Sequence, residues 1–402
     1  MLCSHLALRV PLRSAQPPTT LTSAAAIHTF SSSATSTALT SSTDTTRKLT
    51  STLAGTLAGT RISSDNDNEM RGVATASALA RQLQARAGST HDATFRLPDG
   101  RMLGYAEYGS SRGIPVFVLH GFPSSRLEVD PLDAIGTRMN MRLIALDRPG
   151  FGLSSPHKGR TIIDFAYDLE AFAHAMGIPR FAVAGFSGGG PYALACAHVL
   201  PRKNIAAVGL FASGPPWGED MGKLMTRPRR VMRWMAVHSP WSLQALLGGV
   251  MSMLRWVSST GFIKRKTEEW LEEMDKARNK GDEGRPDRYQ KAKRSASERR
   301  EALFRIMDEP FAQGARATTE EARLLSDPDW GFALEDVKYE PVVRIWHGTK
   351  DTNAPIEAIR YLADKVPNAV LTEFEGETHY TVGPYIEDAL EELVHDMQVE
   401  RK

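Results

Sequence analysis

Short apolar segments separated by turn residues recur along the chain and predict the strands of a buried sheet. Amphipathic helical patterns, such as Thr161–Met176 and Gly190–Leu200, lie between most of these segments. Strands that are apolar on both faces and alternate with helices are typical of a mostly parallel sheet with helices on both sides. We therefore predict an α/β core with the strands Thr94–Leu97, Arg101–Tyr105, Pro115–Leu119, Arg142–Leu146, Phe181–Gly185, Ile205–Phe211, Pro341–Trp346 and Ala369–Phe374.

The alternation breaks between residues 215 and 337, where the pattern predicts helices joined by short turns. The first half of this segment is rich in Met, Trp and Leu, as in Val231–Met235 and Val250–Leu254. The second half, Lys264–Arg305, carries 14 positive and 10 negative residues among 42, which is typical of a solvated helical surface. We expect a helical cap over residues 215–337, inserted into a core formed by residues 91–214 and 338–402.

Residues 1–90 differ in composition from the rest of the chain. The first 60 residues contain 24 Ser or Thr, and the first acidic residue is Asp44. A Ser-rich segment that carries Arg9 and Arg13 but few acidic residues is typical of an organelle transit peptide. The alternative is a disordered tail that cannot bury enough apolar surface to fold. A transit peptide predicts a mitochondrial protein, whereas a tail predicts a cytoplasmic one.

Charge and cysteine content exclude several classes of function. Lys and Arg outnumber Asp and Glu by 49 to 47, a net charge of +2, which is too balanced for a dedicated nucleic-acid binder. Cys3 and Cys196 are too few for a disulfide framework or a four-cysteine zinc site. No run of 18 uncharged apolar residues exists, so we expect no membrane-spanning helix. We also expect no metal or organic cofactor, and the oligomeric state stays open.

The strongest candidate for chemistry is Gly185–Gly189, which reads Gly-Phe-Ser-Gly-Gly between a predicted strand and a predicted helix. A serine nucleophile of this kind must stand at the tip of a sharp strand-to-helix turn, clear of the sheet. The flanking Gly185 and Gly189 would let strand and helix approach without Cβ clashes. A phosphate-binding loop fits less well, because no Lys follows and no G-x-G-x-x-G pattern is present. We therefore interpret Ser187 as a nucleophile.

This segment resembles the nucleophile elbow of the α/β-hydrolase superfamily, and the order of motifs over about residues 93–398 is similar to that of the family. His120–Pro123 reads His-Gly-Phe-Pro and resembles the family's oxyanion loop. The resemblance implies an oxyanion hole formed by the backbone N–H groups of Phe122 and Gly188. The segment Asp147–Ser154 resembles the Asp-x-x-Gly-x-Gly-x-Ser turn, which in the family shapes the loop beneath the active site.

The resemblance also implies the other members of a catalytic triad, in the chain order serine, acid, histidine. His347–Pro355 reads His-Gly-Thr-Lys-Asp-Thr-Asn-Ala-Pro and resembles the family pattern that carries the acid, which implies Asp351. His379 follows the last predicted strand and is the implied base, although Thr378 replaces the usual Gly before it. Some members place the acid after the preceding strand, which here offers Glu219 and Asp220 as the alternative.

The implied activity is that of a serine hydrolase, which cleaves an ester or related acyl substrate through a covalent acyl-enzyme. Epoxide hydrolases and haloalkane dehalogenases of this fold attack with Asp, and Ser187 argues against both. Peptidase and carbon–carbon bond hydrolase activities remain open, as does a non-enzymatic protein that binds a small ligand or a partner. The Met- and Trp-rich half of the insert predicts a small apolar ester-like substrate.

Overall fold

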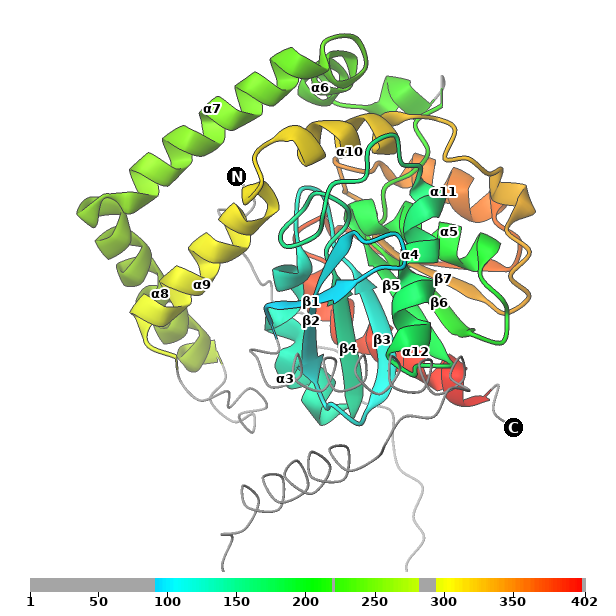
Figure 1. Ribbon diagram of the computed structural model, residues 1–402. Coiled ribbons are helices and arrows are strands. Elements are labelled where there is room, and N and C mark those ends of the chain that lie inside the picture. The colour runs from blue at the N-terminus through cyan, green and yellow to red at the C-terminus, as the bar shows by residue number, and fades with distance from the viewer. Residues whose placement is uncertain (1–90, 219–220, 282–293, 400–402) are drawn as a thin grey trace, which may run out of the picture. The chain divides into compact units, whose positions relative to one another are not determined.

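The computed structural model describes residues 91–218, 221–281 and 294–399 (Figure 1). The predicted transit peptide or tail, residues 1–90, lies outside the described residues. Glu219 and Asp220, the alternative positions for the acid, lie outside them as well.

In the described part of the chain, eight strands form one sheet in the order β1-β2-β4-β3-β5-β6-β7-β8. Strands β3 to β8 pair in parallel, and β2 pairs antiparallel with both β1 and β4. The predicted mostly parallel sheet is therefore confirmed. The strands are β1 (Ala93–Arg96), β2 (Met102–Gly109), β3 (Ile114–Leu119), β4 (Met141–Leu146), β5 (Phe181–Phe186), β6 (Ile205–Phe211), β7 (Val343–Gly348) and β8 (Ala369–Phe374).

Most strand boundaries agree with the prediction to within one residue, and the larger differences are at the end of β2 and at both ends of β7. Strand β2 continues past Tyr105 to Gly109. Its first part, Met102–Tyr105, pairs with β1, and its second part, Tyr105–Gly109, pairs with β4. Strand β7 begins at Val343 rather than at Pro341. The pairing of β7 with β6 and with β8 starts at Val343, two residues beyond Pro341.

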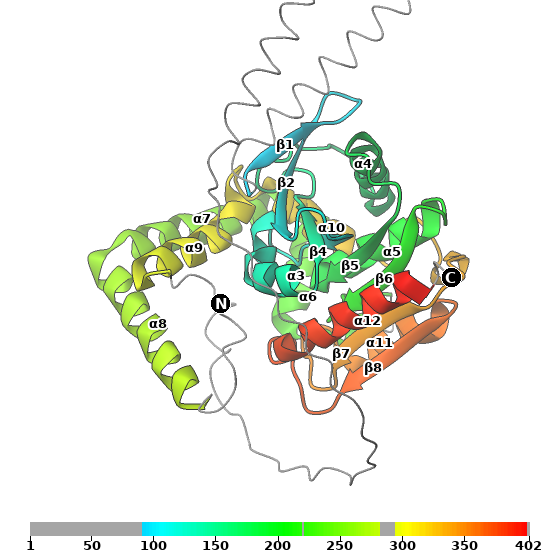
Figure 2. The same ribbon diagram turned by 90° about the horizontal axis from the view of Figure 1, so that it is seen from below.

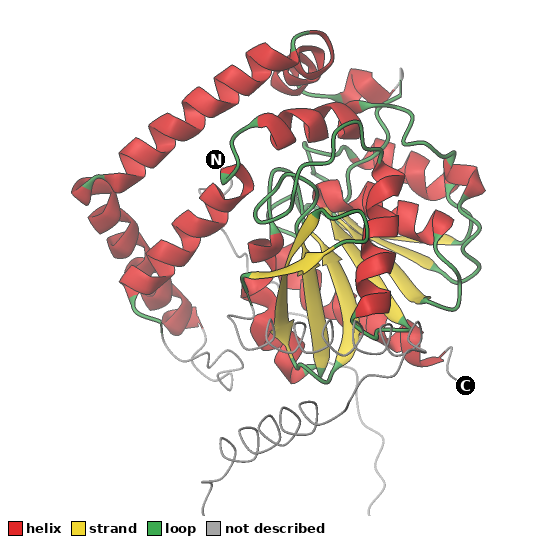
Figure 3. Cartoon of the chain, in the orientation of Figure 1, coloured by secondary structure: helices red, strands yellow, loops and turns green. Residues whose placement is uncertain are grey.

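Helices cover both faces of the sheet, and Figure 3 shows the strands as a layer between them. The two sets of helices lie on opposite sides of the strands (Figure 2). One set packs with the larger buried cluster and contains α4 (Ile162–Ala175), α5 (Gly190–Val199) and α11 (Ile356–Lys365). The other set packs with the second cluster and contains α3 (Asp133–Arg138) and α12 (Ile386–Val399).

Strand β3 explains why the central strands are apolar at every position. Phe117 and Leu119 belong to the cluster on one face, and Val116 and Val118 belong to the cluster on the other. All four side chains are completely buried. Because alternate side chains of a strand point to opposite faces, a strand covered on both sides must be apolar throughout.

Between β6 and β7 the described residues form helices and connecting turns but no strand. Helix α10 packs against α6 and α7, and α9 packs against α8. The long helices of this insert are α6 (Arg227–His238), α7 (Pro240–Ser259), α8 (Gly261–Gly281), α9 (Ala296–Asp308) and α10 (Arg316–Ser326). The short 3₁₀ helices of the described chain are η1 (Arg126–Leu132), η2 (Ser187–Gly189), η3 (Met221–Leu224), η4 (Glu309–Phe311), η5 (Leu334–Asp336) and η6 (Gly383–Tyr385).

Helix α10 is joined to the core by a buried carboxylate. Glu321 is fully buried and accepts hydrogen bonds from Arg148 at 2.6 Å, from the Tyr192 hydroxyl at 2.8 Å and from Arg160. Burial alone would raise the pKa of Glu321, but the two guanidinium groups hold that pKa below its usual value. Glu321 therefore stays ionised and anchors α10 over the sheet.

The variant Glu321→Gln leaves two buried guanidinium groups without their counter-charge, so we expect the free energy of unfolding to fall by about 3–5 kcal/mol. Urea unfolding followed by circular dichroism measures this loss. The matched control is Glu320→Gln on the same helix. Glu320 makes a partly exposed pair with Arg316, so its replacement should change the free energy of unfolding by less than about 1 kcal/mol. Equal losses in the two variants would contradict an anchoring role for Glu321.

Candidate active site

The predicted site residues follow different strands of the parallel part of the sheet. Ser187 comes directly after β5, Asp351 follows β7, and His379 follows β8. The carboxyl ends of parallel strands meet at one edge of a sheet, where open α/β folds bind their ligands. The topology therefore brings together side chains that are far apart in the sequence.

Ser187 occupies a strained turn between β5 and α5. Its φ is +49°, in the left-handed region that residues other than glycine rarely adopt. A Cβ at Gly185 would lie 2.5 Å from the carbonyl oxygen of Gly189, and a Cβ at Gly189 would overlap the carbonyl oxygen of Leu119. Both glycines are needed for the close approach of strand and helix, as we predicted from the sequence.

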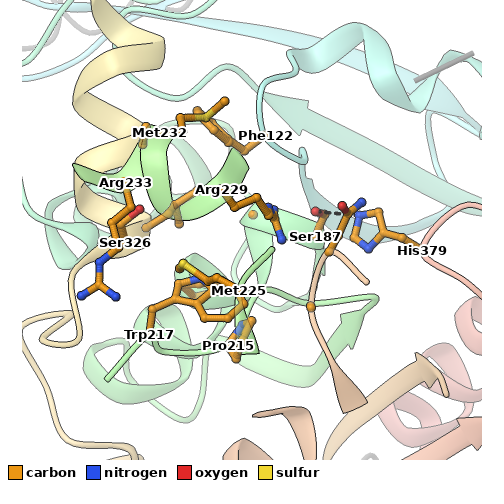
Figure 4. Close-up of a pocket in the computed structure, with 17 residues that line it drawn as sticks. Phe122, Ser187, Pro215, Trp217, Met225, Arg229, Met232, Arg233, Ser326 and His379 are labelled. Carbon is orange, nitrogen blue, oxygen red and sulfur yellow. Dashed lines mark hydrogen bonds between the residues drawn. The ribbon is translucent and has the colours of Figure 1, made fainter. Parts of the chain in front are cut away.

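Ser187, His379 and Asp351 form a continuous hydrogen-bonded chain. The Ser187 hydroxyl lies 3.0 Å from Nε2 of His379, and Nδ1 of His379 lies 2.6 Å from Oδ2 of Asp351. With the ring proton on Nδ1, the imidazole donates to Asp351 and accepts the hydroxyl proton of Ser187. Figure 4 shows Ser187 and His379 facing each other at one side of a pocket. This is the arrangement of nucleophile, base and orienting acid.

Asp351 is buried and fully hydrogen-bonded. While Oδ2 accepts from His379, Oδ1 accepts the backbone N–H groups of Asn353 at 2.7 Å and Ala354 at 2.9 Å. Burial alone would raise the pKa of Asp351, but the hydrogen bond from His379 and the nearby imidazoles hold that pKa below its usual value. The carboxylate therefore remains charged and fixes the orientation of the imidazole ring.

Two other histidines lie near this chain of residues but have structural partners. Nε2 of His347 lies 2.8 Å from the carbonyl oxygen of Ala354 and 3.3 Å from Oδ2 of Asp351. Nε2 of His120 accepts the backbone N–H of Arg148, and its Nδ1 lies 2.8 Å from the carbonyl oxygen of Gly121. Burial lowers the pKa of both histidines, that of His120 by a large amount. Both rings are therefore neutral parts of the loops that flank the site.

The predicted oxyanion loop lies against the turn that carries Ser187. Phe122 and Gly188 line the same pocket as Ser187, and a Cβ at Gly188 would lie 2.7 Å from Cβ of Phe122 and 3.3 Å from its backbone nitrogen. Among the described residues, the N–H group of Phe122 has no hydrogen-bond partner. An amide that faces a pocket without an internal acceptor is suited to bind an oxyanion. The oxyanion hole itself stays a prediction.

Glu128 is close to the site and was not predicted from the sequence. Its Oε2 accepts the backbone N–H of Gly121 at 2.5 Å. A Cβ at Gly121 would lie 3.1 Å from Oε1 of Glu128 and 3.4 Å from Cβ of Ser187, so a side chain there would require the Glu128 carboxylate to shift by a few tenths of an ångström. Burial raises the pKa of Glu128. Glu128 holds the loop of Phe122 beside the nucleophile, and no sequence motif distinguishes it from other acidic residues.

The pocket next to Ser187 is lined partly by the insert. Trp217, Met225 and Met232 contribute apolar side chains, and Arg229 and Arg233 contribute charged ones (Figure 4). The expectation of an apolar lining from the Met- and Trp-rich half is thus met at only a few positions, and the two arginines were not predicted.

Other tryptophans of the insert point to solvent instead. Trp241 is 75% exposed, Trp256 is 70% exposed and Trp234 is 59% exposed. Within residues 91–218, 221–281 and 294–399, no group of three or more His, Cys, Asp or Glu side chains is arranged to hold a metal ion. None of the helices in these ranges is long and apolar enough to cross a membrane.

Known proteins are similar to this chain over part of its length. A proline iminopeptidase from Xylella fastidiosa is 34% identical over 118 residues, which are 28% of this chain and 37% of the peptidase. A non-heme chloroperoxidase from Streptomyces lividans is 32% identical over 125 residues, which are 31% of this chain and 45% of that protein. This chain therefore matches less than half the length of either relative.

Solved structures share the fold over a larger part of the chain. A structure from work on carboxylesterases of Nitrososphaera gargenis has a TM-score of 0.51 at 14% identity, and covers 76% of this chain and 99% of its own. A bromoperoxidase from Bacillus anthracis has a TM-score of 0.50 at 18% identity, with 76% and 99% covered. The family model described as the α/β hydrolase fold matches residues 114–382, which include Ser187, Asp351 and His379. The chain therefore belongs to the α/β-hydrolase fold family.

Proposed function

We propose that this α/β hydrolase is a serine hydrolase that cleaves an ester or related acyl substrate through a covalent acyl-enzyme on Ser187. The observation that supports this most directly is the hydrogen-bonded chain from the Ser187 hydroxyl through His379 to Asp351. The serine stands on a strained turn and lines a pocket whose other lining residues come from both the core and the insert.

The proposed reaction has two stages. His379 takes the hydroxyl proton as Oγ of Ser187 attacks the carbonyl carbon, and the imidazolium then gives that proton to the leaving alcohol. The charge of Asp351 stabilises the imidazolium. The N–H groups of Phe122 and Gly188 stabilise the tetrahedral oxyanion, and loss of one such donor costs about 3 kcal/mol. Water activated by His379 then releases the acid from Ser187.

A peptidase is the second candidate, because the relative from Xylella fastidiosa is named a proline iminopeptidase. Carbon–carbon bond hydrolysis would use the same nucleophile and base. The non-enzymatic alternative, a protein that binds a small ligand or a partner in this pocket, requires no hydrogen bond between Ser187 and His379. The geometry of that bond therefore favours an enzyme.

Labelling with a fluorophosphonate probe tests the proposal before any substrate is known. Such probes react with a serine that an adjacent base activates, so the folded protein should be labelled at Ser187 and the heat-unfolded protein should not. Mass spectrometry of the digested protein locates the modified residue. Absence of label on Ser187 in the folded protein would favour the binding protein over the enzyme.

The buried apolar side chains of the pocket should set the preferred length of the acyl chain. Trp217 and Met225 are each 6% exposed and line the pocket, so Trp217→Ala and Met225→Ala create space beside Ser187. We expect the ratio of kcat/KM for octanoyl over acetyl esters to change about tenfold, since a methylene in an apolar pocket contributes about 1–3 kcal/mol. The matched control is Trp241→Ala, at a 75% exposed position. An unchanged ratio in both pocket variants would mean that these side chains only pack.

We also propose that the Ser- and Thr-rich segment directs the protein to mitochondria, with a cytoplasmic protein as the alternative. Its support is the composition of residues 1–60, in which Arg9 and Arg13 precede the first acidic residue. Fused to a fluorescent reporter, this segment should co-localise with a mitochondrial stain. The same fusion with Arg9→Ala and Arg13→Ala should be diffuse. A diffuse signal from the unmodified fusion contradicts the proposal.

A further inference from the structure

The pocket beside Ser187 contains a cationic side chain that the proposed reaction does not use. Arg229 is the third residue of α6, in the insert, and lines the pocket together with Ser187 and His379. Figure 4 shows its side chain extending across the pocket toward Ser187. Arg233, one helical turn later, lines the same pocket, but Figure 4 shows its guanidinium group directed away from Ser187.

Arg229 is partly buried and has no acidic partner at hydrogen-bond distance. Its Nη1 atom is buried and has no hydrogen-bond partner in the described structure. Its guanidinium group lies 5.9 Å from the ring centre of Trp217, at the edge of the range for a cation–π contact. Burial lowers the pKa of Arg229, and the charge of Asp351 offsets that effect only in part.

Arg126 and Arg148, which are fully buried, differ from Arg229 because each is paired with acidic side chains of the protein. Arg126 is paired with Asp147 at 2.8 Å and with Glu309 at 2.6 Å, and Arg148 is paired with Glu321 at 2.6 Å. A buried cation is strongly unfavourable unless an anion and hydrogen-bond acceptors compensate it. In the core these partners belong to the protein, whereas in the pocket the protein offers Arg229 none at hydrogen-bond distance.

A substrate can supply the missing anion. A guanidinium group presents parallel N–H donors that match the two oxygens of a carboxylate. A single arginine with the charged Asp351 nearby suits a monoanion better than a doubly charged phosphate. Met225 and Trp217 line the same pocket as Arg229 and Ser187, and their apolar side chains offer a wall for a short methylene chain.

We propose that the substrate of Ser187 is an ester that also carries a carboxylate, and that Arg229 binds this carboxylate inside the catalytic pocket. The inference rests on the proposed serine hydrolase function and narrows its substrate class. It also revises the expectation of a small apolar ester-like substrate. In the revised proposal the apolar side chains contact only the methylene groups of the substrate that lie between its ester and its carboxylate.

The test compares esters that differ only in the charge at the far end. Monomethyl succinate, glutarate and adipate carry a carboxylate at increasing distance from the ester, and each is paired with a neutral ester that ends in an isopropyl group. A second series carries the carboxylate on the alcohol side, as acetate esters of short hydroxy acids. Release of acid is followed in a pH-stat. The ratio of kcat/KM within each pair reports recognition of the charge.

For the preferred chain length, Arg229→Met should lower this ratio about 10- to 100-fold, because hydrogen bonds between charged groups contribute about 1.5–3 kcal/mol. Arg229→Lys should recover part of it. The matched control is Arg230→Met at the neighbouring, exposed position, which should leave the ratio unchanged. Because Arg229 is unpaired, its replacement by Met should not lower the melting temperature.

Different outcomes separate this inference from the proposed function. If Arg229→Met lowers turnover of neutral and charged esters equally, then Arg229 affects catalysis through the charge of Asp351 and does not bind a substrate carboxylate. The inference is then wrong. If the wild type hydrolyses the neutral esters of both series faster, the inference is also wrong, but the serine hydrolase stands. If no ester is cleaved, calorimetry with the Ser187→Ala variant still decides: monomethyl glutarate must bind, and must not bind once Arg229→Met is added.

Discussion

Replacing Ser187 with alanine is expected to reduce turnover of the best ester substrate about 10⁶-fold, as loss of the nucleophile does in serine proteases. The Ser187 hydroxyl is the atom that His379 faces at 3.0 Å, and alanine has nothing in its place. The change removes one oxygen atom and introduces no larger group, so the free energy of unfolding should stay within about 0.5 kcal/mol of the wild type. Steady-state kinetics and urea unfolding measure the two effects.

The matched control for Ser187→Ala is Ser326→Ala, which removes a hydroxyl from the same pocket without touching the hydrogen-bonded chain. Its turnover should be close to that of the wild type. If Ser187→Ala still hydrolyses the ester about 10³- to 10⁴-fold faster than water does, this residual activity would agree with a contribution from the oxyanion hole. Turnover near the wild-type level would mean that another residue is the nucleophile.

The sheet could be predicted because its strands carry an unambiguous pattern. Strands buried on both faces leave no polar position, as in Val116–Leu119, and turn residues bound each of them. The boundaries were less certain, since pairing decides them. Gly109 belongs to β2 because β4 lies beside it, and β7 starts at Val343 because its pairing with β6 and β8 starts there.

The positions of Ser187, Asp351 and His379 could be predicted because each follows a strand that the sequence reveals. Parallel strands must end at the same edge, so residues directly after them meet whatever their distance along the chain. Ser187 and His379 are 192 residues apart and lie within hydrogen-bond distance. The motifs supplied the residue types, and the sheet topology supplied the proximity.

The lining of the pocket could not be predicted, because the apolar residues of the insert do not mark a single buried face. In α6, Ala236 is buried and Met232 lines the pocket, yet Val231 and Trp234 are exposed. Which side of such a helix faces the site depends on how it packs against α10. Arg229 stands in a run of basic residues that reads as a solvated surface, so its burial is visible only in three dimensions.

The identity of the acid is the part of the proposed triad with an explicit competitor in the sequence, and the geometry argues for Asp351. His379 points Nδ1 at Asp351 across 2.6 Å, and two backbone N–H groups hold the other carboxylate oxygen. The pKa of Asp351 lies below its usual value of 3.8. The carboxylate is therefore ionised between pH 5 and 6, so a loss of activity in that range cannot come from its protonation.

Asp351→Asn is accordingly expected to lower kcat about 10⁴-fold with little change in KM. The amide of asparagine can donate to Nδ1 of His379, which stabilises the ring tautomer that cannot accept the serine proton, and it removes the charge that supports the imidazolium. Glu219→Gln and Asp220→Asn are the controls and should keep turnover within a few-fold of the wild type. If Asp351→Asn keeps its activity and one of those two variants loses it, the acid follows β6 instead, and His379 must then take its orientation from that loop.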